Sequence, residues 1–323
     1  MKDYYKDKEI LIIGGTGSLG KTLLKLLKKG YSPRGIRILS RDENKQWELQ
    51  TEMQEQGYSM DKVARLLGDV RDLERLKRAF SGVDIVIHCA AQKHVPSCEE
   101  NPMEAIKTNV IGAANVVEAA LDCQVEQVVF ISTDKAVYPI NLYGCSKAVA
   151  EKVILDANVY RGKRAKTKFC VMRYGNVLGS RGSIIPLFRA LNACGKPLPI
   201  TDPRMTRFFI RLPEVAKFVL DRIPEMEAGE IFVPKMKGVK IMELADMICP
   251  GTQMEIVGIR PGEKLHECLI SEEESRWRLE DKGSHFVIHN TNREENLAAR
   301  EYTSEQAAAE NTLQKSDIEN LYI

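Results

Sequence analysis

Tyr143 and Lys147 are the two residues whose types and spacing most clearly indicate catalysis. They stand four positions apart in Tyr143-Gly-Cys-Ser-Lys147, so on a helix they share one face and lie one above the other. A nearby cation favours phenolate, and we therefore expect the pKa of Tyr143 to fall from about 10 toward neutral pH. Such a pair would act as the acid/base in hydride transfer with a nicotinamide, although Tyr-x-x-x-Lys also occurs by chance in many helices.

A second reactive group, Thr133-Asp134-Lys135, follows an apolar strand predicted over Gln127–Ser132. Ligands of open parallel sheets bind outside the carboxyl ends of the strands. A hydroxyl, a carboxylate and an amine are therefore expected to converge where a substrate would lie. The structural alternative is a helix cap followed by an exposed salt-bridge pair.

The elements that must position these residues alternate along the first half of the chain. Short β-branched runs predict strands at Glu9–Ile13, Ile36–Ser40, Val83–His88 and Gln127–Ser132. Helical patterns lie between them, at Lys21–Lys29, Asp42–Gln56 and around Ala105–Leu121. This alternation predicts a parallel sheet covered on both faces, with right-handed crossovers. The expected fold class is α/β, a Rossmann-like doubly wound parallel sheet with a smaller C-terminal substrate-binding lobe.

A glycine-rich turn between the first strand and the first helix predicts a dinucleotide site. Gly14-Gly-Thr-Gly-Ser-Leu-Gly20 contains the Gly-x-Gly-x-x-Gly fingerprint, in which the backbone approaches a pyrophosphate held at the helix N-terminus. The residues expected to bind cofactor here are Gly14, Thr16, Gly17, Ser18, Leu19 and Gly20. Further cofactor contacts are predicted at the ends of later strands, where Asp69, Val70, Ala90 and Ala91 are placed to line the adenine and the pyrophosphate. These four residues could equally be plain strand ends.

The end of the second predicted strand bears on the choice between NADP and NAD. An NAD enzyme usually places Asp or Glu there to bind the ribose 2′-hydroxyl, whereas this chain has Ser40-Arg41-Asp42, with Lys45 one helical turn later. A planar, permanently charged guanidinium suits a 2′-phosphate, so Ser40, Arg41 and Lys45 predict NADP. Asp42 could still serve as the acid, and Arg41 could be a solvated surface residue.

The second half of the chain is less regular. Five prolines between residues 186 and 213 interrupt short apolar stretches, and sheet-like pieces at Gly229–Pro234 and Gln253–Ile259 flank a helix at Ile241–Met247. We expect an NADP-binding Rossmann domain with the catalytic residues at 1–175. A substrate-binding lobe interleaved with the last Rossmann elements should span 176–290. The polar tail, 291–323, is expected to be a surface arm or partly mobile.

Composition excludes several classes of protein. Lys plus Arg total 47 against 45 for Asp plus Glu, a net charge of +2, so nucleic acid is not an expected partner. The eight cysteines include no Cys-x-x-Cys pair, which is typical of reduced thiols in the cytoplasm. The histidines show no metal-ligand spacing, the charged N-terminus differs from a signal peptide, and apolar runs are too short to span a bilayer. We therefore expect a cytoplasmic protein without metal or membrane contact.

Taken together, the motifs resemble the extended short-chain dehydrogenases/reductases that act on nucleotide sugars. Ordinary sugar-nucleotide 4,6-dehydratases carry Thr-Asp-Glu where this chain has Thr133-Asp134-Lys135, and the lysine version resembles UDP-N-acetylglucosamine 4,6-dehydratases. The matching stretches run from about residue 9 to 270: Ser40–Glu43, Lys93–Pro96, Arg173–Asn176, Gly179–Ser183, Met205–Phe208 and Arg260–Glu267. Ile13 departs from the usual Thr before the first glycine, and the tail beyond Ser271 matches less well. Retaining, membrane-anchored relatives often replace the catalytic Tyr with Met, so Tyr143 favours inversion.

The resemblance implies a mechanism and a substrate site. Tyr143, aided by Lys147 and Thr133, would take the 4-hydroxyl proton; Lys135 would remove the C5 proton while Asp134 protonates the departing 6-hydroxyl. A lysine base requires a depressed pKa, which desolvation could supply. Substrate residues carried over are Lys93, Asn176, Arg181, Thr201 and Arg260, although either arginine could be a structural salt bridge. The family also implies a UDP-sugar substrate, a homo-oligomer such as a hexamer, and a place in pseudaminic acid synthesis for flagellin glycosylation.

Two rival functions fit the same fold. A nucleotide-sugar 4-epimerase or 4-ketoreductase shares Tyr-x-x-x-Lys but does not need the Asp134-Lys135 pair, and a retaining 4,6-dehydratase differs only at C5. A non-enzymatic NADP-sensing or scaffold protein would share the fold but has no reason to keep Tyr143, Lys147, Asp134 and Lys135 together. The mass of the product separates an epimerase or a ketoreductase from a dehydratase, since dehydration removes water, epimerisation changes nothing and reduction adds two hydrogens.

Overall fold

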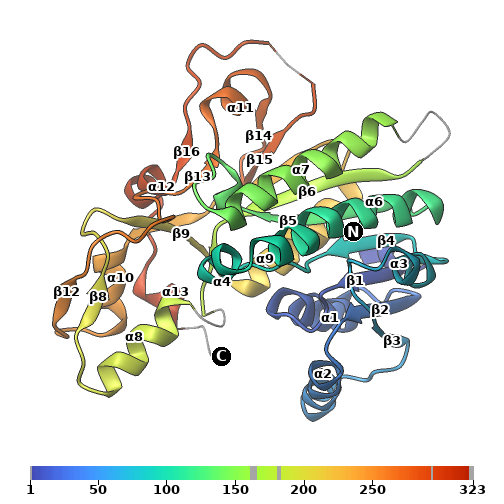
Figure 1. Ribbon diagram of the computed structural model, residues 1–323, viewed down its shortest axis with the longest axis horizontal. Helices are drawn as coiled ribbons and strands as arrows, with labels where there is room; N and C mark the ends of the chain where they lie inside the picture. The colour runs from blue at the N-terminus through green and yellow to red at the C-terminus, as the bar shows by residue number, and fades with distance from the viewer. Residues whose placement is uncertain (1, 161–165, 180–182, 292–293, 320–323) are drawn as a thin grey trace.

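The chain is built around one nine-stranded sheet, which Figure 1 shows in the computed structural model. The structure describes residues 2–160, 166–179, 183–291 and 294–319. The strand order is β14-β15-β10-β6-β5-β4-β1-β2-β3. Their bounds are β1 (Glu9–Ile13), β2 (Gly35–Ser40), β3 (Val63–Leu67), β4 (Ile85–His88), β5 (Gln127–Thr133), β6 (Lys168–Tyr174), β10 (Ile231–Pro234), β14 (Leu279–Asp281) and β15 (His285–Ile288). In the order of the sheet, the seven strands from β10 to β3 are parallel to one another. β15 is antiparallel to β10, and β14 is antiparallel to β15. The predicted fold class is therefore confirmed.

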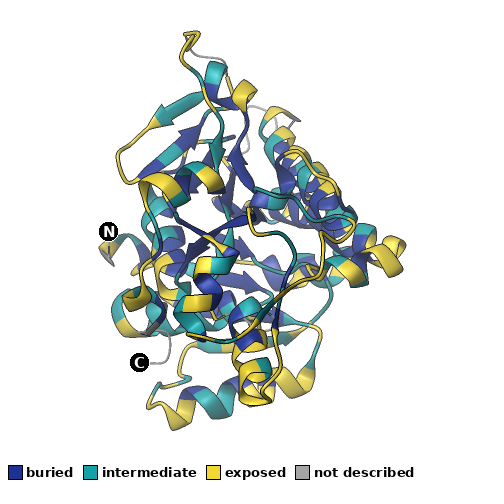
Figure 2. Ribbon diagram, turned by 90° about the vertical axis from the view of Figure 1, so that its left-hand side faces the viewer, coloured by how far each residue is buried: buried dark blue, intermediate teal, exposed yellow. Residues whose placement is uncertain are grey.

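Helices cover both faces of this sheet (Figure 1). On one face α1 (Ser18–Gly30) packs against α9 (Leu212–Arg222); on the other α6 (Gly112–Asp122) packs against α3 (Leu73–Phe80) and α7 (Leu142–Tyr160). Each helix turns an apolar stripe inward, as α1 does with the buried side chains of Leu23, Leu24 and Leu27. Figure 2 shows the result, with buried residues in the sheet and exposed residues on the outer helix faces. Because both faces are covered, the inner strands are continuously apolar rather than alternating.

The helix expected around Ala105–Leu121 is divided in the structure. It consists of α5 (Pro102–Ile106), a π-helical turn (Lys107–Ile111) and α6. Asn109 lies in the π turn with its side chain buried, and its amide hydrogen-bonds the backbone of Gln92 and the hydroxyl of Ser146. Hydrophobic periodicity cannot reveal such an interruption, because all three segments remain helical. π-helical turns occur frequently at functional sites.

The second lobe has its own sheets and core. β7 (Asn176–Val177), β9 (Thr206–Ile210) and β11 (Lys237–Lys240) form one sheet, and β8 (Leu198–Ile200) with β12 (Met254–Ile256) forms another. Helices α8 (Ile184–Ala193) and α10 (Ile241–Ile248) pack beside them. Their apolar residues form a core cluster separate from that of the main sheet, with Phe188, Ile200, Phe209 and Leu244 among its members.

The polar tail is folded where the structure describes it. β16 (Tyr302–Thr303) pairs with β13 (Cys268–Ile270), α12 (Ser304–Glu310) packs on β11, and α13 (Lys315–Glu319) follows. Gly238 permits this contact, because a Cβ there would stand 2.2 Å from the backbone nitrogen of Ala308. The expectation of a surface arm or mobile segment therefore does not hold for these residues, whose few buried side chains give a weak hydrophobic pattern.

The remaining elements are one longer helix and several short ones. They are α2 (Glu43–Glu55), α4 (Val95–Glu100), α11 (Glu272–Trp277) and the 3-10 turns Lys2–Tyr5, Asp134–Ala136 and Ile223–Glu225. Within the described ranges, no helix has both the length and the apolar character needed to cross a bilayer.

Candidate active site

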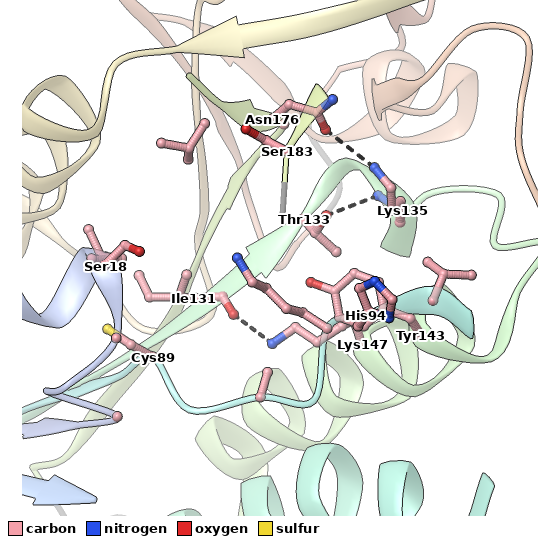
Figure 3. Close-up of a pocket in the computed structure, with 18 of the residues that line it drawn as sticks. Ser18, Cys89, His94, Ile131, Thr133, Lys135, Tyr143, Lys147, Asn176 and Ser183 are labelled. Atoms are coloured by element: carbon pink, nitrogen blue, oxygen red, sulfur yellow. Dashed lines mark hydrogen bonds between the residues drawn. The ribbon is translucent and has the colours of Figure 1, made fainter. Parts of the chain in front are cut away.

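A cavity of about 1090 Å³ opens at the carboxyl ends of the parallel strands. Its floor lies at the carboxyl ends of the neighbouring strands β1 and β4, between which the strand order reverses and at which doubly wound folds bind ligands. Residues of the second lobe, including Thr201, Phe209 and Arg260, form the opposite wall. Figure 3 looks into this cavity and shows the reactive side chains from β5 and α7 gathered on one side.

The glycine turn forms one end of the cavity. Gly14 has φ +79°, and a Cβ there would lie 2.8 Å from the backbone nitrogen of Ala90, so the first strand and β4 approach too closely for a side chain. Gly17 is the N-cap of α1 and contributes no side-chain cap, and Ser18, Leu19 and Gly20 of the first turn line the cavity. The free amide groups of this turn fit a pyrophosphate.

The adjacent wall carries the residues that face the adenosine ribose in this type of fold. Ser40, Arg41 and Lys45 line the cavity. The carboxylate of Asp42 accepts a hydrogen bond from the Lys45 backbone nitrogen at 3.0 Å and caps α2. Asp42 also lines the cavity. Each cation of this wall has an acidic neighbour, since Arg41, 61% exposed, lies 3.5 Å from Asp69 and Lys45 lies 3.3 Å from Asp42.

The other expected cofactor residues are placed as follows. Thr16, Val70, Ala90 and Ala91 line the cavity, whereas Asp69 is absent from its described wall. The carboxylate of Asp69 instead accepts hydrogen bonds from Arg71 and lies 3.5 Å from the Arg41 guanidinium.

Tyr143 and Lys147 extend from α7 toward the end of β5, as the motif predicts. The Lys147 ammonium donates to the Ile131 carbonyl at 2.6 Å and lies 3.7 Å from the centre of the Phe130 ring. Burial lowers the pKa of Lys147 to about 7. Burial likewise raises the pKa of Tyr143 to about 12, against the opposing effects of Lys135 and Thr133.

The direction expected for the pKa of Tyr143 is therefore wrong for the protein without ligands. Desolvation of the phenol outweighs the nearby cations.

Thr133, Asp134 and Lys135 lie at the end of β5 and in the following 3-10 turn. Thr133 and Lys135 line the cavity, whereas Asp134 is fully buried directly behind them. Its Oδ1 accepts from the Thr133 hydroxyl at 3.0 Å and from the Lys135 ammonium at 3.0 Å. Burial raises the pKa of Asp134. Asp134 therefore contacts two residues of the cavity wall through Oδ1, while its Oδ2 lies beside Gly175, which also lines the cavity.

The Lys135 ammonium is bound by two carboxylates. Besides Asp134, it lies 3.1 Å from Oε1 of Glu267 and 3.5 Å from Oδ1 of Asn176. The two carboxylates outweigh burial and hold the pKa of Lys135 above its usual value. The pKa of Lys135 is therefore not depressed, as a lysine base would require. The sequence motif could not indicate this, because it contains Asp134 but not the second acidic partner, Glu267.

Four of the five expected substrate residues, Lys93, Asn176, Thr201 and Arg260, line the same cavity. Burial lowers the pKa of Lys93, because desolvation disfavours the charged form of an amine. The fifth residue, Arg181, lies outside the described residues. One cavity thus combines the glycine turn, the acid/base pair, the Thr133–Lys135 group and the proposed substrate contacts.

Sequence reasoning missed the buried ion pairs behind the site. The Arg173 guanidinium contacts Glu151 of α7 at 2.7 Å and Glu274 of α11 at 3.1 Å, and the Ser132 hydroxyl donates to Glu151. The network fixes the end of β5 against α7 and the later chain. Arg173 lies in one of the stretches that carry the family resemblance, but nothing local to it indicates partners so distant in sequence.

Comparison with known proteins agrees with this geometry. A family model described as polysaccharide biosynthesis protein matches residues 10–289. The inverting UDP-N-acetylglucosamine 4,6-dehydratase of Campylobacter jejuni strain 81-176 is 49% identical over 85% of this chain and 81% of its own. The UDP-glucose 4-epimerase of Rickettsia canadensis is 42% identical over 91% and 86%. The solved structure of Pen from Bacillus thuringiensis has a TM-score of 0.89 at 34% identity, covering 98% of this chain and 97% of that one. The chain belongs to the polysaccharide biosynthesis protein family, within the extended short-chain dehydrogenases/reductases.

Proposed function

We propose that this protein is a UDP-N-acetylglucosamine 4,6-dehydratase that inverts C5 and uses NADP. The observation that carries the proposal is the juxtaposition of two reactive groups on one cavity wall: Tyr143 with Lys147, suited to oxidation at C4, and Asp134 with Lys135, suited to elimination across C5 and C6. A phenol at position 143, rather than Met, supports inversion. The similarity to the C. jejuni enzyme supports both the sugar and the C5 outcome.

The preference for NADP rests on Arg41 and Lys45. Both line the cavity where a 2′-phosphate would lie, and the one carboxylate of that loop, Asp42, caps α2. When bound, NADP would accept hydride from C4 of the sugar and return it to C6. Gly17, Ser18 and Leu19 would hold its pyrophosphate at the N-terminus of α1.

Proton transfers at the sugar fall to the residues of β5 and α7. As a phenolate, Tyr143 would take the proton of the 4-hydroxyl, with the Thr133 hydroxyl as its hydrogen-bond partner. The positive charge of an oxidised nicotinamide beside it would lower the phenol pKa that burial raises. The 4-ketone acidifies the C5 hydrogen, which a neutral Lys135 removes. Lys135 becomes neutral by passing a proton to Asp134 across their 3.0 Å contact, and this step makes the base and the acid together.

Elimination then restores the starting charges. Asp134 returns its proton to the departing 6-hydroxyl along the Thr133 hydroxyl, 3.0 Å away, while Lys135 keeps the proton from C5. One water leaves, Asp134 is again a carboxylate and Lys135 is again an ammonium. When hydride returns to C6, C5 takes up a solvent-exchangeable proton, and release of the O4 proton by Tyr143 balances the cycle. The relay through Thr133 follows from the position of Asp134 behind the cavity wall.

The deciding experiment is incubation with UDP-N-acetylglucosamine, followed by proton NMR and mass spectrometry. We expect a product lighter by one water, with a C6 methyl group and inverted C5. In heavy water, deuterium should appear at C5. A product of unchanged mass with C4 inverted would instead identify a 4-epimerase, the alternative that the Rickettsia relative supports.

The remaining assignments rest on the resemblance of the sequence motifs to the nucleotide-sugar dehydratases. The substrate diphosphate is expected to contact Lys93, Arg181 and Arg260. The protein is expected to form a homo-oligomer such as a hexamer and to supply 4-keto sugar for pseudaminic acid synthesis. Size-exclusion chromatography with light scattering tests the assembly.

A further inference from the structure

Glu267 lies on the cavity wall but has no part in the reaction described so far. It directly precedes β13, only 2% of its surface is exposed, and it lines the cavity beside Lys135. Its Oε1 is 3.1 Å from the Lys135 ammonium, on which Asp134 also acts at 3.0 Å. Two carboxylates therefore share one ammonium.

The chain around Glu267 holds this carboxylate in a fixed position. Its backbone nitrogen donates to the Ser304 hydroxyl at 2.9 Å, and its carbonyl accepts from the Ser304 backbone nitrogen at 2.8 Å. Two further cations face it: Lys264 at 3.6 Å from Oε2 and Arg207 at 3.9 Å from Oε1. Glu267 is thus attached to both the second lobe and the folded tail.

The two carboxylates differ in their surroundings. Three cations, Lys135, Arg207 and Lys264, outweigh burial and lower the pKa of Glu267. Asp134 has Lys135 as its cation, its Oδ2 is buried without a partner among the described residues, and burial raises its pKa, with Glu267 adding to the rise. Neighbouring acids whose pKa values are driven apart commonly divide the roles of charged and protonated group.

We propose that Glu267 is a positioning residue for the elimination step: it stays ionised as the counter-ion of Lys135, so that Asp134 is free to carry the proton that the 6-hydroxyl takes. Without a second carboxylate, Asp134 would itself have to neutralise the buried ammonium. It would then resist protonation. Glu267 neither gives nor takes a proton in the cycle. This inference rests on the proposed dehydratase function, and it places the acid and its counter-ion on separate segments of the chain.

The test removes the charge of Glu267 and keeps its shape. In Glu267→Gln, Asp134 and Lys135 both lose a neighbouring negative charge, and a charge at this distance shifts a pKa by about one to three units. The groups facing Lys135 in the variant are Asp134, Arg207 and Tyr143. We expect the pH profile of kcat to move as a whole toward lower pH by about one unit or more, with KM changed less than about twofold.

A second measurement, an NMR titration, does not depend on turnover. The carboxyl ¹³C resonance of Asp134, assigned with Asp134→Asn, should titrate at lower pH in Glu267→Gln than in the wild type, without substrate. If wild-type protein fails to release water from UDP-N-acetylglucosamine, the proposed function is wrong. If the Asp134 resonance titrates at the same pH in both proteins, the role of Glu267 is wrong, whatever the substrate.

Two further variants separate charge from structure. Glu305→Gln removes an exposed carboxylate that pairs with neighbouring His266 at 3.6 Å, and it should leave the profile in place. Glu267→Asp keeps the charge but places it farther from Lys135, so its Asp134 resonance should titrate between the wild-type and Glu267→Gln values. If the glutamine variant does not fold, an Asp134 resonance that titrates in the aspartate variant at the wild-type pH would count against the proposal. Loss of kcat without displacement of the profile would overturn it and leave Glu267 a structural ion pair.

Discussion

Replacement of Lys147 by methionine should make the ligand-free protein more stable while abolishing turnover. Only 2% of the Lys147 surface is exposed, and burial lowers its pKa from 10.5 to about 7. Each pKa unit corresponds to about 1.4 kcal/mol, so a protonated Lys147 costs the folded state about 5 kcal/mol. Methionine fills a similar volume without charge, and the lost hydrogen bond to the Ile131 carbonyl is worth only about 1 kcal/mol.

The sign of the pH dependence follows from the depressed pKa. Between pH 7 and 10.5 the unfolded chain keeps the Lys147 proton and the folded chain has lost it, so the stability of the wild type rises with pH in this window. The advantage of Lys147→Met should therefore be about 3–4 kcal/mol near pH 7 and shrink by about 1.4 kcal/mol per pH unit. The hydrogen-bond contribution does not vary with pH, so the slope isolates the buried charge.

The assay is urea unfolding of cofactor-free protein at pH 7, 8 and 9, followed by tryptophan fluorescence. Both proteins are compared at one fixed concentration, because assembly would otherwise alter the apparent stability. A difference in unfolding free energy that stays constant with pH, or a variant less stable than wild type at pH 7, would refute the reasoning. Stability gained with activity lost is the usual trade-off at a strained site.

Three further substitutions test separate parts of the site. Arg41→Ala should weaken NADP binding by about 1.5–3 kcal/mol, as expected for a charged hydrogen bond, and NAD binding much less; calorimetry showing equal losses would contradict a 2′-phosphate contact. Tyr143→Phe should keep the fold and cofactor binding but lose hydride transfer from C4, so NADPH absorbance should not rise on adding substrate; near wild-type turnover would point to another acid/base. Lys135→Met should still oxidise C4 yet take up little deuterium at C5 in heavy water, and wild-type uptake would exclude Lys135 as the base.

The sequence predicts the part of the fold in which both faces of a strand are covered. β1, β4 and β5 carry continuous apolar runs, and their expected positions agree with the structure to within about two residues. The tail could not be predicted in the same way. α12 is held by small contacts, namely the buried Ser304 and Ala307 against Gly238, and such contacts leave almost no hydrophobic periodicity.

For the site, motifs identified the residues but not their electrostatics. The glycine turn, Tyr143 and Lys135 are recognisable because each occurs at a fixed distance from a strand end. The expected pKa directions of Tyr143 and Lys135 are wrong because burial raises the pKa of Tyr143, and because Asp134 and Glu267 together raise that of Lys135. Neither the burial of Tyr143 nor the contact of Lys135 with Glu267 can be recognised from neighbouring residues in the sequence. Glu267 follows Lys135 far along the chain and contacts it only in the folded protein.

The order in which the chain contributes to its sheet has a consequence for biosynthesis. β15 covers the edge of β10, and Glu274 neutralises the buried guanidinium of Arg173, yet both emerge from the ribosome after the strands that they complete. Until then the nascent chain would expose the edge of β10, which could pair with other chains. Arg173 would also lack Glu274, one of its two counter-ions. Final assembly of the catalytic wall must therefore await the residues around 267–288, and before that point the growing polypeptide is a natural client for a chaperone.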